Sequence, residues 1–175
     1  WRTILEKKDH PAGLVLSRQN LPVWAREDIH SDTGGEKFAS AEGTARGGYV
    51  MADTEGTPDV ILIATGSEVE IALEARHKLS EKGIAARVVS MPSREWFNEQ
   101  SNEYRESVLP SSVAARVSVE AGLGMSWYDL LGSAGRAVSI EHFGASADSK
   151  TLYRELGITP EAVVNAAEES IAAAK

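Results

Sequence analysis

One arginine of the sequence is suited to binding a charged ligand. Arg18 follows the apolar residues 13–16, which predict a short strand. The loop around it also carries Ser17, Gln19 and Asn20. A guanidinium group forms paired hydrogen bonds with phosphates and carboxylates, and ligands of α/β proteins usually lie where strands end. Arg18 is therefore a candidate anion-binding residue, with an ordinary surface ion pair as the alternative.

The turn at Gly66 and Ser67 is a second candidate site. It follows the apolar run 60–64 and precedes a helical pattern, so free backbone amides at the helix start could hold an anion. Glu68 and Glu70 fall in the first helical turn, where they would offset the helix dipole and repel a phosphate. Ser67 and Glu70 also have the spacing of a capping box. We therefore interpret the turn as a helix cap, with the anion site as the alternative.

Other motifs that carry chemistry are incomplete. Gly122 and Gly124 begin a dinucleotide fingerprint, but Trp127 stands where the third glycine belongs. The sequence holds neither a G-x-x-x-x-G-K-[ST] phosphate loop nor a G-x-S-x-G nucleophile elbow. His142 is the one histidine that follows a predicted strand. The others, scattered without metal-ligand spacing, are His10, His30 and His77.

The elements that would position these residues alternate between strands and helices. The unbroken run 60–64 predicts a strand covered on both faces, and residues 67–82 predict the amphipathic helix after it, ended by Gly83. Thr159 and Pro160 mark the start of the last helix. Further strands are expected at residues 48–52, 85–91, 114–120 and 136–141, and further helices at 94–109, 126–131 and 150–156.

This alternation predicts an α/β fold with a mostly parallel sheet and helices on both faces. The Gly- and Pro-containing residues 53–58 allow a hairpin between the strands 48–52 and 59–64, which would make the first strand pair antiparallel. A sheet of five strands, mixed and mostly parallel, is the expected architecture.

Composition excludes several function classes. The chain of 175 residues has no cysteine, which excludes disulfides and thiolate chemistry. Its net charge of −8 argues against nucleic-acid binding and against anionic membrane surfaces. Neither a bilayer-spanning run nor a signal peptide is apparent, so we expect a cytoplasmic protein. Because the chain opens at Trp1 without an initiator methionine, we also expect a piece of a longer protein.

Four separated blocks of the sequence together resemble the C-terminal part of a transketolase. They follow one another in the family's order and cover nearly the whole chain. The blocks are Leu16-Ser17-Arg18-Gln19-Asn20-Leu21-Pro22; Ala64-Thr65-Gly66-Ser67-Glu68-Val69; Ser90-Met91-Pro92-Ser93 with Tyr104-Arg105-Glu106-Ser107-Val108-Leu109-Pro110; and Phe143-Gly144-Ala145-Ser146-Ala147 with Leu152-Tyr153 and Gly157-Ile158-Thr159.

The resemblance implies a function for the longer protein. Transketolases are homodimers that use thiamine diphosphate and Mg or Ca, and they move a two-carbon ketol unit from a ketose phosphate such as xylulose 5-phosphate to an aldose phosphate such as ribose 5-phosphate. This reaction belongs to the pentose phosphate pathway. The arginine of the S-R-Q-N-L-P block helps to bind the substrate phosphate in that family, which implies this role for Arg18.

The same resemblance implies that this chain is not catalytic alone. The family's diphosphate- and metal-binding G-D-G…N segment and its cofactor-activating glutamate lie upstream of the matched region, so no catalytic, cofactor-binding or metal-binding residue is expected here. The implied partners are the other domains and the second subunit. The implied division is a remnant of the pyrimidine-binding domain at residues 1–24, a linker at 25–46 and the C-terminal domain at 47–175.

An anion- or effector-binding regulatory module is the alternative function. It would use the turns after the strands, near Gly66, Met91, Gly122 and Gly144, because ligands of open α/β sheets bind there.

Overall fold

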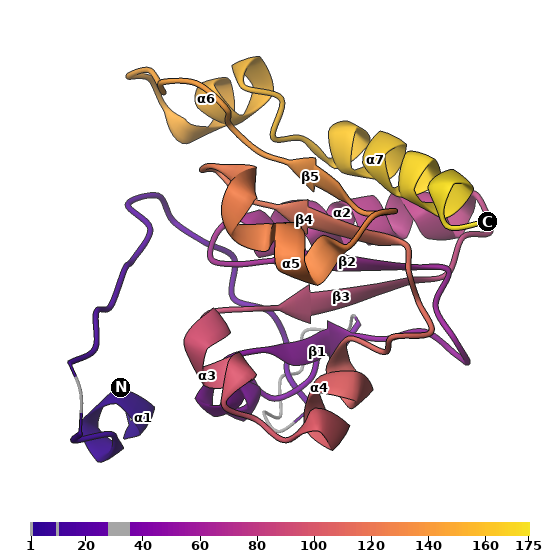
Figure 1. Cartoon of the computed structure of the whole chain (residues 1–175). Helices are drawn as coiled ribbons and strands as arrows, with labels where there is room; N and C mark the ends of the chain where they lie inside the picture. The colour runs from indigo at the N-terminus through magenta and orange to yellow at the C-terminus, as the bar shows by residue number, and fades with distance from the viewer. Residues whose placement is uncertain (1, 10, 28–35) are drawn as a thin grey trace.

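A computed structural model describes residues 2–9, 11–27 and 36–175, and a five-stranded sheet forms its centre (Figure 1). The strand order across the sheet is β1-β3-β2-β4-β5. The pairs β2–β3, β2–β4 and β4–β5 are parallel. The strands are β1 (Tyr49–Ala52), β2 (Val60–Ala64), β3 (Ala86–Ser90), β4 (Arg116–Val119) and β5 (Arg136–Val138). The mixed, mostly parallel α/β sheet is therefore confirmed.

The middle strand β2 explains why its sequence is an unbroken apolar run. Every residue of β2 is fully buried, with β3 on one side and β4 on the other. Helices cover both faces of the sheet, so neither set of alternating side chains meets water. Leu62 and Ile63, on opposite faces, belong to two separate hydrophobic clusters.

The antiparallel pair is not the hairpin that the turn 53–58 suggests. β1 pairs with β3, where Tyr49 faces Ser90, and not with β2. Both edges of β2 are already occupied by parallel neighbours, and the intervening turn is long enough for the chain to cross to the far side of β3. Two hydrogen bonds of 2.8 and 2.9 Å from the Arg87 guanidinium to the Asp53 carboxylate tie this turn to β3.

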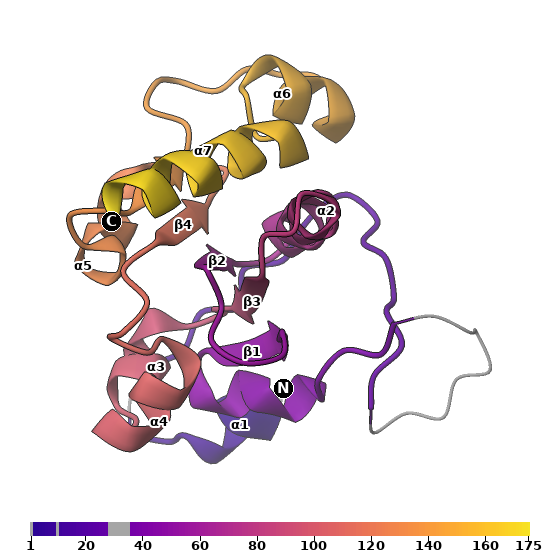
Figure 2. The same cartoon turned by 90° about the vertical axis from the view of Figure 1, so that its right-hand side faces the viewer.

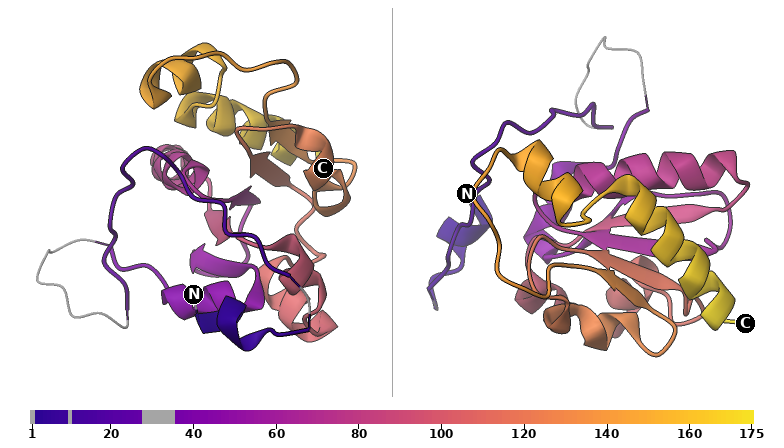
Figure 3. Two further views of the ribbon diagram at one scale, coloured as in Figure 1. Left: turned by 90° about the vertical axis from the view of Figure 1, so that its left-hand side faces the viewer. Right: turned by 90° about the horizontal axis from the view of Figure 1, so that it is seen from above.

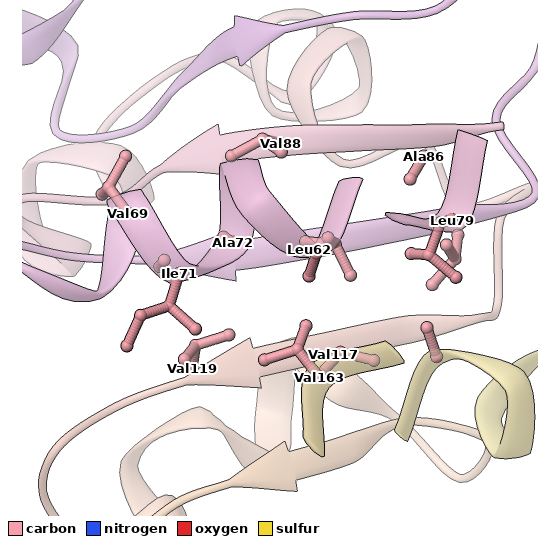
Figure 4. Close-up of a cluster of buried hydrophobic side chains, with 14 of the residues drawn as sticks. Leu62, Val69, Ile71, Ala72, Leu79, Ala86, Val88, Val117, Val119 and Val163 are labelled. Carbon is pink, nitrogen blue, oxygen red and sulfur yellow. The ribbon is translucent and has the colours of Figure 1, made fainter. Parts of the chain in front are cut away.

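The two faces of the sheet carry different helices (Figure 2). The helices α2 (Glu68–Glu81) and α7 (Pro160–Ala173) cover one face, and the shorter α3 (Arg94–Asn98), α4 (Asn102–Val108) and α5 (Tyr128–Leu131) cover the other. Figure 4 shows side chains of α2, including Ala72 and Leu79, directed at the strands. The Thr159 hydroxyl accepts a hydrogen bond from the Ala162 amide and caps α7, as the sequence predicts.

The region expected to be one helix at 94–109 forms two. Ser93 caps α3 by accepting from the Trp96 amide, and Ser101 caps α4 by accepting from the Tyr104 amide. Each serine offers its hydroxyl to the backbone, which favours a new helix start over continuation. The remaining helices are α1 (Arg2–Glu6), the 3₁₀ helices η1 (Ala41–Arg46) and η2 (Gly124–Trp127), and α6 (Ser149–Glu155).

The strand expected at residues 13–16 does not form. Residues 11–24 run as an irregular segment across the edge of the sheet where the parallel strands end (Figures 1 and 3). Leu14, Val15 and Leu16 are 45%, 97% and 73% exposed. A strand needs a hydrogen-bonded neighbour, and in the described part of the chain no strand lies beside this segment.

Residues 25–46, expected as a linker, include short ordered contacts. Arg26 and Phe38 form an isolated bridge, and the Phe38 ring is buried against Trp24 at a centroid distance of 6.2 Å. η1 lies in the same range, and a hydrogen bond from the Ser93 amide to the Gly47 carbonyl, 2.9 Å long, connects the end of this region to the start of α3.

Candidate functional site at the ends of the parallel strands

All four parallel strands end on the same edge of the sheet, which faces the viewer in the left panel of Figure 3. The turns after them bring together polar side chains that are far apart in the sequence. This edge is where a ligand of an open α/β sheet is expected.

A buried carboxylate is the centre of this edge. Glu68, at the start of α2, is only 6% exposed. Its Oε1 accepts hydrogen bonds from the Ala121 amide (3.0 Å) and the Tyr153 hydroxyl (3.2 Å), and its Oε2 accepts from the Ser67 hydroxyl (3.1 Å). The Ser67 and Tyr153 oxygens are 2.7 Å apart. We call these four residues, Ser67, Glu68, Ala121 and Tyr153, the Glu68 network.

This network shows that the predicted capping box is wrong. Ser67 has helical backbone angles (φ −67°, ψ −25°), and its side chain makes no capping hydrogen bond. Its hydroxyl is instead engaged by Tyr153 and Glu68. Tyr153 lies 85 positions from Glu68 in the sequence, so the local spacing of Ser67 and Glu70 gave no indication of this arrangement.

A second acid lies beside this network. Burial raises the pKa of Glu120, the first residue after β4, and the nearby Glu68 carboxylate raises it further, while the Trp127 indole acts in the opposite direction. The Glu68 carboxylate thus lies beside the Gly66 turn, and Glu120 lies close to that carboxylate. An added phosphate would meet their negative charge, which supports the structural interpretation of this turn over the anion site.

Glu120→Gln is expected to stabilise the chain at alkaline pH. Because the folded protein holds the Glu120 proton more tightly than the unfolded chain, stability falls as pH rises from the ordinary carboxyl pKa through the raised one. Glutamine has no charge to desolvate, so the variant should be more stable than the native protein above that window. Urea unfolding between pH 4 and 9 measures this difference. The exposed Glu103→Gln is the control, and parallel pH profiles for native protein and Glu120→Gln would contradict the prediction.

The turns after β4 and β5 are joined by a third acid. Glu141 Oε1 accepts hydrogen bonds from the Ser139 hydroxyl (2.7 Å) and the Gly124 amide (3.0 Å), and both lower the pKa of Glu141. Gly124 opens η2, whose Trp127 is buried. The glycines 122 and 124 therefore shape a turn held by a carboxylate, and not a diphosphate-binding loop.

A shallow cleft of about 430 Å³ opens near the ends of β2 and β3. Thr65, Met91, Arg94 and Trp127 contribute to its walls. Arg94 is the basic group there, but its guanidinium pairs with the Asp129 carboxylate at 2.5 Å and lies over the Trp127 ring. Its charge is compensated, so this cleft does not favour the anion-binding alternative.

Arg18 lies in the segment that crosses the same edge. Its side chain is exposed, and no hydrogen bond or ion pair joins it to the described residues. The neighbouring Gln19 is half-buried, and its side chain is near enough to the Tyr153 hydroxyl to affect the pKa of Tyr153. The structure thus brings the Arg18 loop near the Glu68 network, an arrangement that the sequence did not indicate.

The remaining candidates are not brought together. His142 is exposed, with its Nδ1 2.8 Å from the Phe143 carbonyl oxygen, and His77 is exposed on α2 beside Glu81. Gly144 lies in an exposed loop. His10 and His30 lie outside the described residues. Sequence reasoning missed Glu120 and the buried, hydrogen-bonded role of Glu68, although an acid directly after the buried strand β4 and another at the start of α2 are signals that could have indicated them.

The described residues contain no group of three or more His, Cys, Asp or Glu side chains that could hold a metal ion. These residues therefore do not fit the metal that anchors a diphosphate cofactor. No helix in the described ranges has the length and apolarity to cross a bilayer.

The fold and this edge define an α/β domain in which glutamate side chains accept hydrogen bonds from the backbone amides at the strand ends. The family model of the transketolase-like TK C-terminal domain matches residues 47–159. The chain therefore belongs to the transketolase family, as its C-terminal domain.

Individual relatives extend the match. A transketolase of Mycobacterium leprae is 53% identical over 97% of this chain, which spans 23% of that protein. A solved transketolase variant from Pichia stipitis, in complex with fructose-6-phosphate, is similar at 34% identity and a TM-score of 0.72, over 89% of this chain and 20% of that one. A split-gene transketolase, described as an inactive beta4 tetramer, matches at 25% identity and a TM-score of 0.59, over 90% of this chain and 49% of that one.

Proposed function

We propose that this chain is the C-terminal part of a transketolase that transfers a two-carbon ketol unit between sugar phosphates in the pentose phosphate pathway. The carrying observation is the family match over residues 47–159 together with 53% identity to the Mycobacterium leprae transketolase. The chain spans about a quarter of the curated relatives that it matches. Ketose and aldose phosphates are the proposed substrates, and the sugar phosphate bound to the Pichia stipitis relative supports this class.

Arg18 is the proposed substrate-binding residue of the chain. Its exposed guanidinium lies on a loop at the strand-end edge and is available to a ligand. A guanidinium binds a terminal phosphate with paired, charge-assisted hydrogen bonds. The acids at positions 68 and 120 make the rest of the edge unsuitable for this anion, so we assign the phosphate to Arg18 alone among the described residues.

Thiamine diphosphate with Mg or Ca is the proposed cofactor of the whole enzyme, and it supplies the carbanion chemistry of ketol transfer when bound. The other domains and a second identical subunit are the proposed partners, and the exposed Leu14, Val15 and Leu16 are suited to contacts with them. A cytoplasmic location agrees with this metabolic role.

The proposed division of the chain is 1–24 as the end of the pyrimidine-binding domain, 25–46 as a linker and 47–175 as the C-terminal domain. The start of the family match at residue 47 supports the last boundary.

The isolated chain is expected to show no ketol transfer when supplied with thiamine diphosphate and Mg²⁺, because no described residue provides a cofactor site. The matched control is a full-length transketolase that contains this chain, assayed with the same ketose and aldose phosphates. Turnover by the isolated chain would overturn its non-catalytic role. A full-length enzyme without transketolase activity would overturn the proposed reaction itself.

A further inference from the structure

A second cleft, of about 280 Å³, lies on the face of the sheet that α3, α4 and α5 cover. Its walls include two arginines, Arg105 of α4 and Arg116, the first residue of β4. The acids described above lie at the carboxyl ends of the strands, whereas Arg116 marks the amino end of β4. This cleft is therefore separate from the strand-end edge, and its charge has to be considered by itself.

The Arg116 guanidinium is held by backbone oxygens. It donates to the carbonyls of Val113 (3.1 Å), Leu130 (2.8 Å), Leu109 (3.2 Å) and Pro110 (3.0 Å). These oxygens orient the group between the ends of α4 and α5, but they carry no net charge. At least one N–H group of Nη1 is left without a partner among the described residues. Burial lowers the pKa of Arg116, as expected for a cation that is partly removed from water.

The Arg105 guanidinium also has a neutral partner. It donates to the side-chain oxygen of Asn102, and its Nε has no hydrogen-bond partner in the described part of the chain. Arg87 and Arg94, on neighbouring elements, are by contrast paired with aspartates. Within the described residues, no carboxylate forms an ion pair with Arg105 or Arg116. Most of the hydrogen-bonding capacity of Arg105 is therefore unused.

One acid lines the cleft and offsets part of this charge. Glu106 Oε2 accepts a hydrogen bond of 2.8 Å from the Ser111 amide. This bond lowers the pKa of Glu106, and the charges of Arg116 and Arg105 lower it further. Because two guanidinium groups are offset by a single carboxylate in these walls, the cleft keeps an excess of positive charge in a chain whose net charge is −8.

An oxyanion fits this combination of charge and donors. Asn98, Asn102 and Ser111 complete the polar part of the walls without adding charge. A phosphate group has several oxygens, which can accept from two guanidinium groups at once, and such hydrogen bonds are strong because they are charge-assisted. The volume of about 280 Å³ suits inorganic phosphate or a small phosphorylated sugar.

We propose that the cleft between α4 and α5 binds the phosphate group of a small anion through Arg105 and Arg116. Arg105 provides the N–H groups that Asn102 leaves unused, and Arg116 adds the remaining N–H group of a guanidinium that its carbonyl partners hold in place. The site is separate from the proposed substrate phosphate, because Arg18 lies on the segment that crosses the opposite ends of the strands.

The test is an NMR titration of the isotopically labelled chain with sodium phosphate, at pH 7 and constant ionic strength. Saturable amide shifts are expected at Asn102, Arg105 and Ser111, with a dissociation constant on the order of 1 mM. Ribose 5-phosphate should shift the same amides, and ribose should not. Acetate, with a single charge and two oxygens, should bind several times more weakly than phosphate.

Two variants should change the affinity in opposite directions. Arg105→Ala removes charge-assisted hydrogen bonds, so phosphate should bind about 10- to 100-fold more weakly. Glu106→Gln removes the negative charge and keeps an oxygen for the Ser111 amide, so phosphate should bind about two- to fivefold more tightly. Arg154→Ala, on the exposed side of α6, is the matched control and should leave the affinity unchanged.

No saturable shift at these amides up to about 50 mM phosphate, roughly 50 times the expected dissociation constant, would overturn the site. Equal affinities of the native chain and Arg105→Ala would also overturn it. If Arg105→Ala does not fold, Glu106→Gln decides, and an affinity that does not increase contradicts the proposal. If the response to phosphate is lost in Arg18→Ala and kept in Arg105→Ala, the cleft is wrong while the phosphate role of Arg18 stands.

Discussion

Arg18→Ala in a full-length transketolase that contains this chain is expected to raise the KM for phosphorylated donors and acceptors by about 10- to 100-fold. The estimate is the loss of one or two hydrogen bonds to a charged group, about 1.5–3 kcal/mol in binding free energy. Unphosphorylated substrates have no group for the guanidinium to bind, so their KM should change little. Steady-state kinetics with matched phosphorylated and unphosphorylated donors give the comparison.

Two further variants separate a specific contact from general charge. Arg18→Lys keeps the charge but loses the planar fork, so it should recover only part of the binding. Arg154→Ala removes a cation from α6 that is 70% exposed and paired with its neighbour Glu155, and it should have little effect on any substrate. Equal effects of Arg18→Ala on both kinds of donor would remove the phosphate role from this residue.

Gly47→Ala is expected to destabilise the fold by about 3 kcal/mol or more, lowering Tm by roughly 10 °C. Gly47 has φ +81°, and a Cβ built on it would lie 2.3 Å from both the Phe97 amide nitrogen and the Ser93 carbonyl oxygen. These are backbone atoms of α3 and its cap, which cannot rotate away as a side chain can. The substitution therefore separates η1 from α3.

Gly56→Ala is the matched control for this prediction. Gly56 also has a positive φ, +73°, but a Cβ there meets nothing within 4 Å. It should cost only the backbone strain, about 1–2 kcal/mol. Thermal unfolding of the two variants separates the effect of the close contact between Gly47 and the α3 backbone from that of backbone strain. Equal losses of Tm in the two variants would show that this contact does not restrict residue 47.

Local sequence determined the individual elements better than their pairing. The apolar run of β2 and the Thr159-Pro160 start of α7 were predictable because burial on both faces and helix capping leave marks within a few residues. The partner of β1 was not, because the turn 53–58 allows a hairpin and only the occupied edges of β2 exclude it.

The candidate site shows the same difference between local features, which the sequence predicts, and long-range contacts, which it does not. The role of Arg18 rests on a sequence block and stays a prediction. The Glu68 network joins the start of α2, the end of β4 and the middle of α6, and no spacing within one segment reveals such a contact. Ser67 is an example. Serine is a common helix-capping residue, but the hydroxyl of Ser67 bonds to the distant Tyr153 and not to the backbone of α2.

The acidic side chains at the strand ends affect which ligands can bind to this domain. A parallel sheet normally leaves its amide-rich turns open at this edge, and nucleotides and phosphates bind there. Here Glu68, Glu120 and Glu141 already occupy the amides or repel a second anion. The negative charge of these side chains therefore disfavours the binding of a further anion at the strand ends.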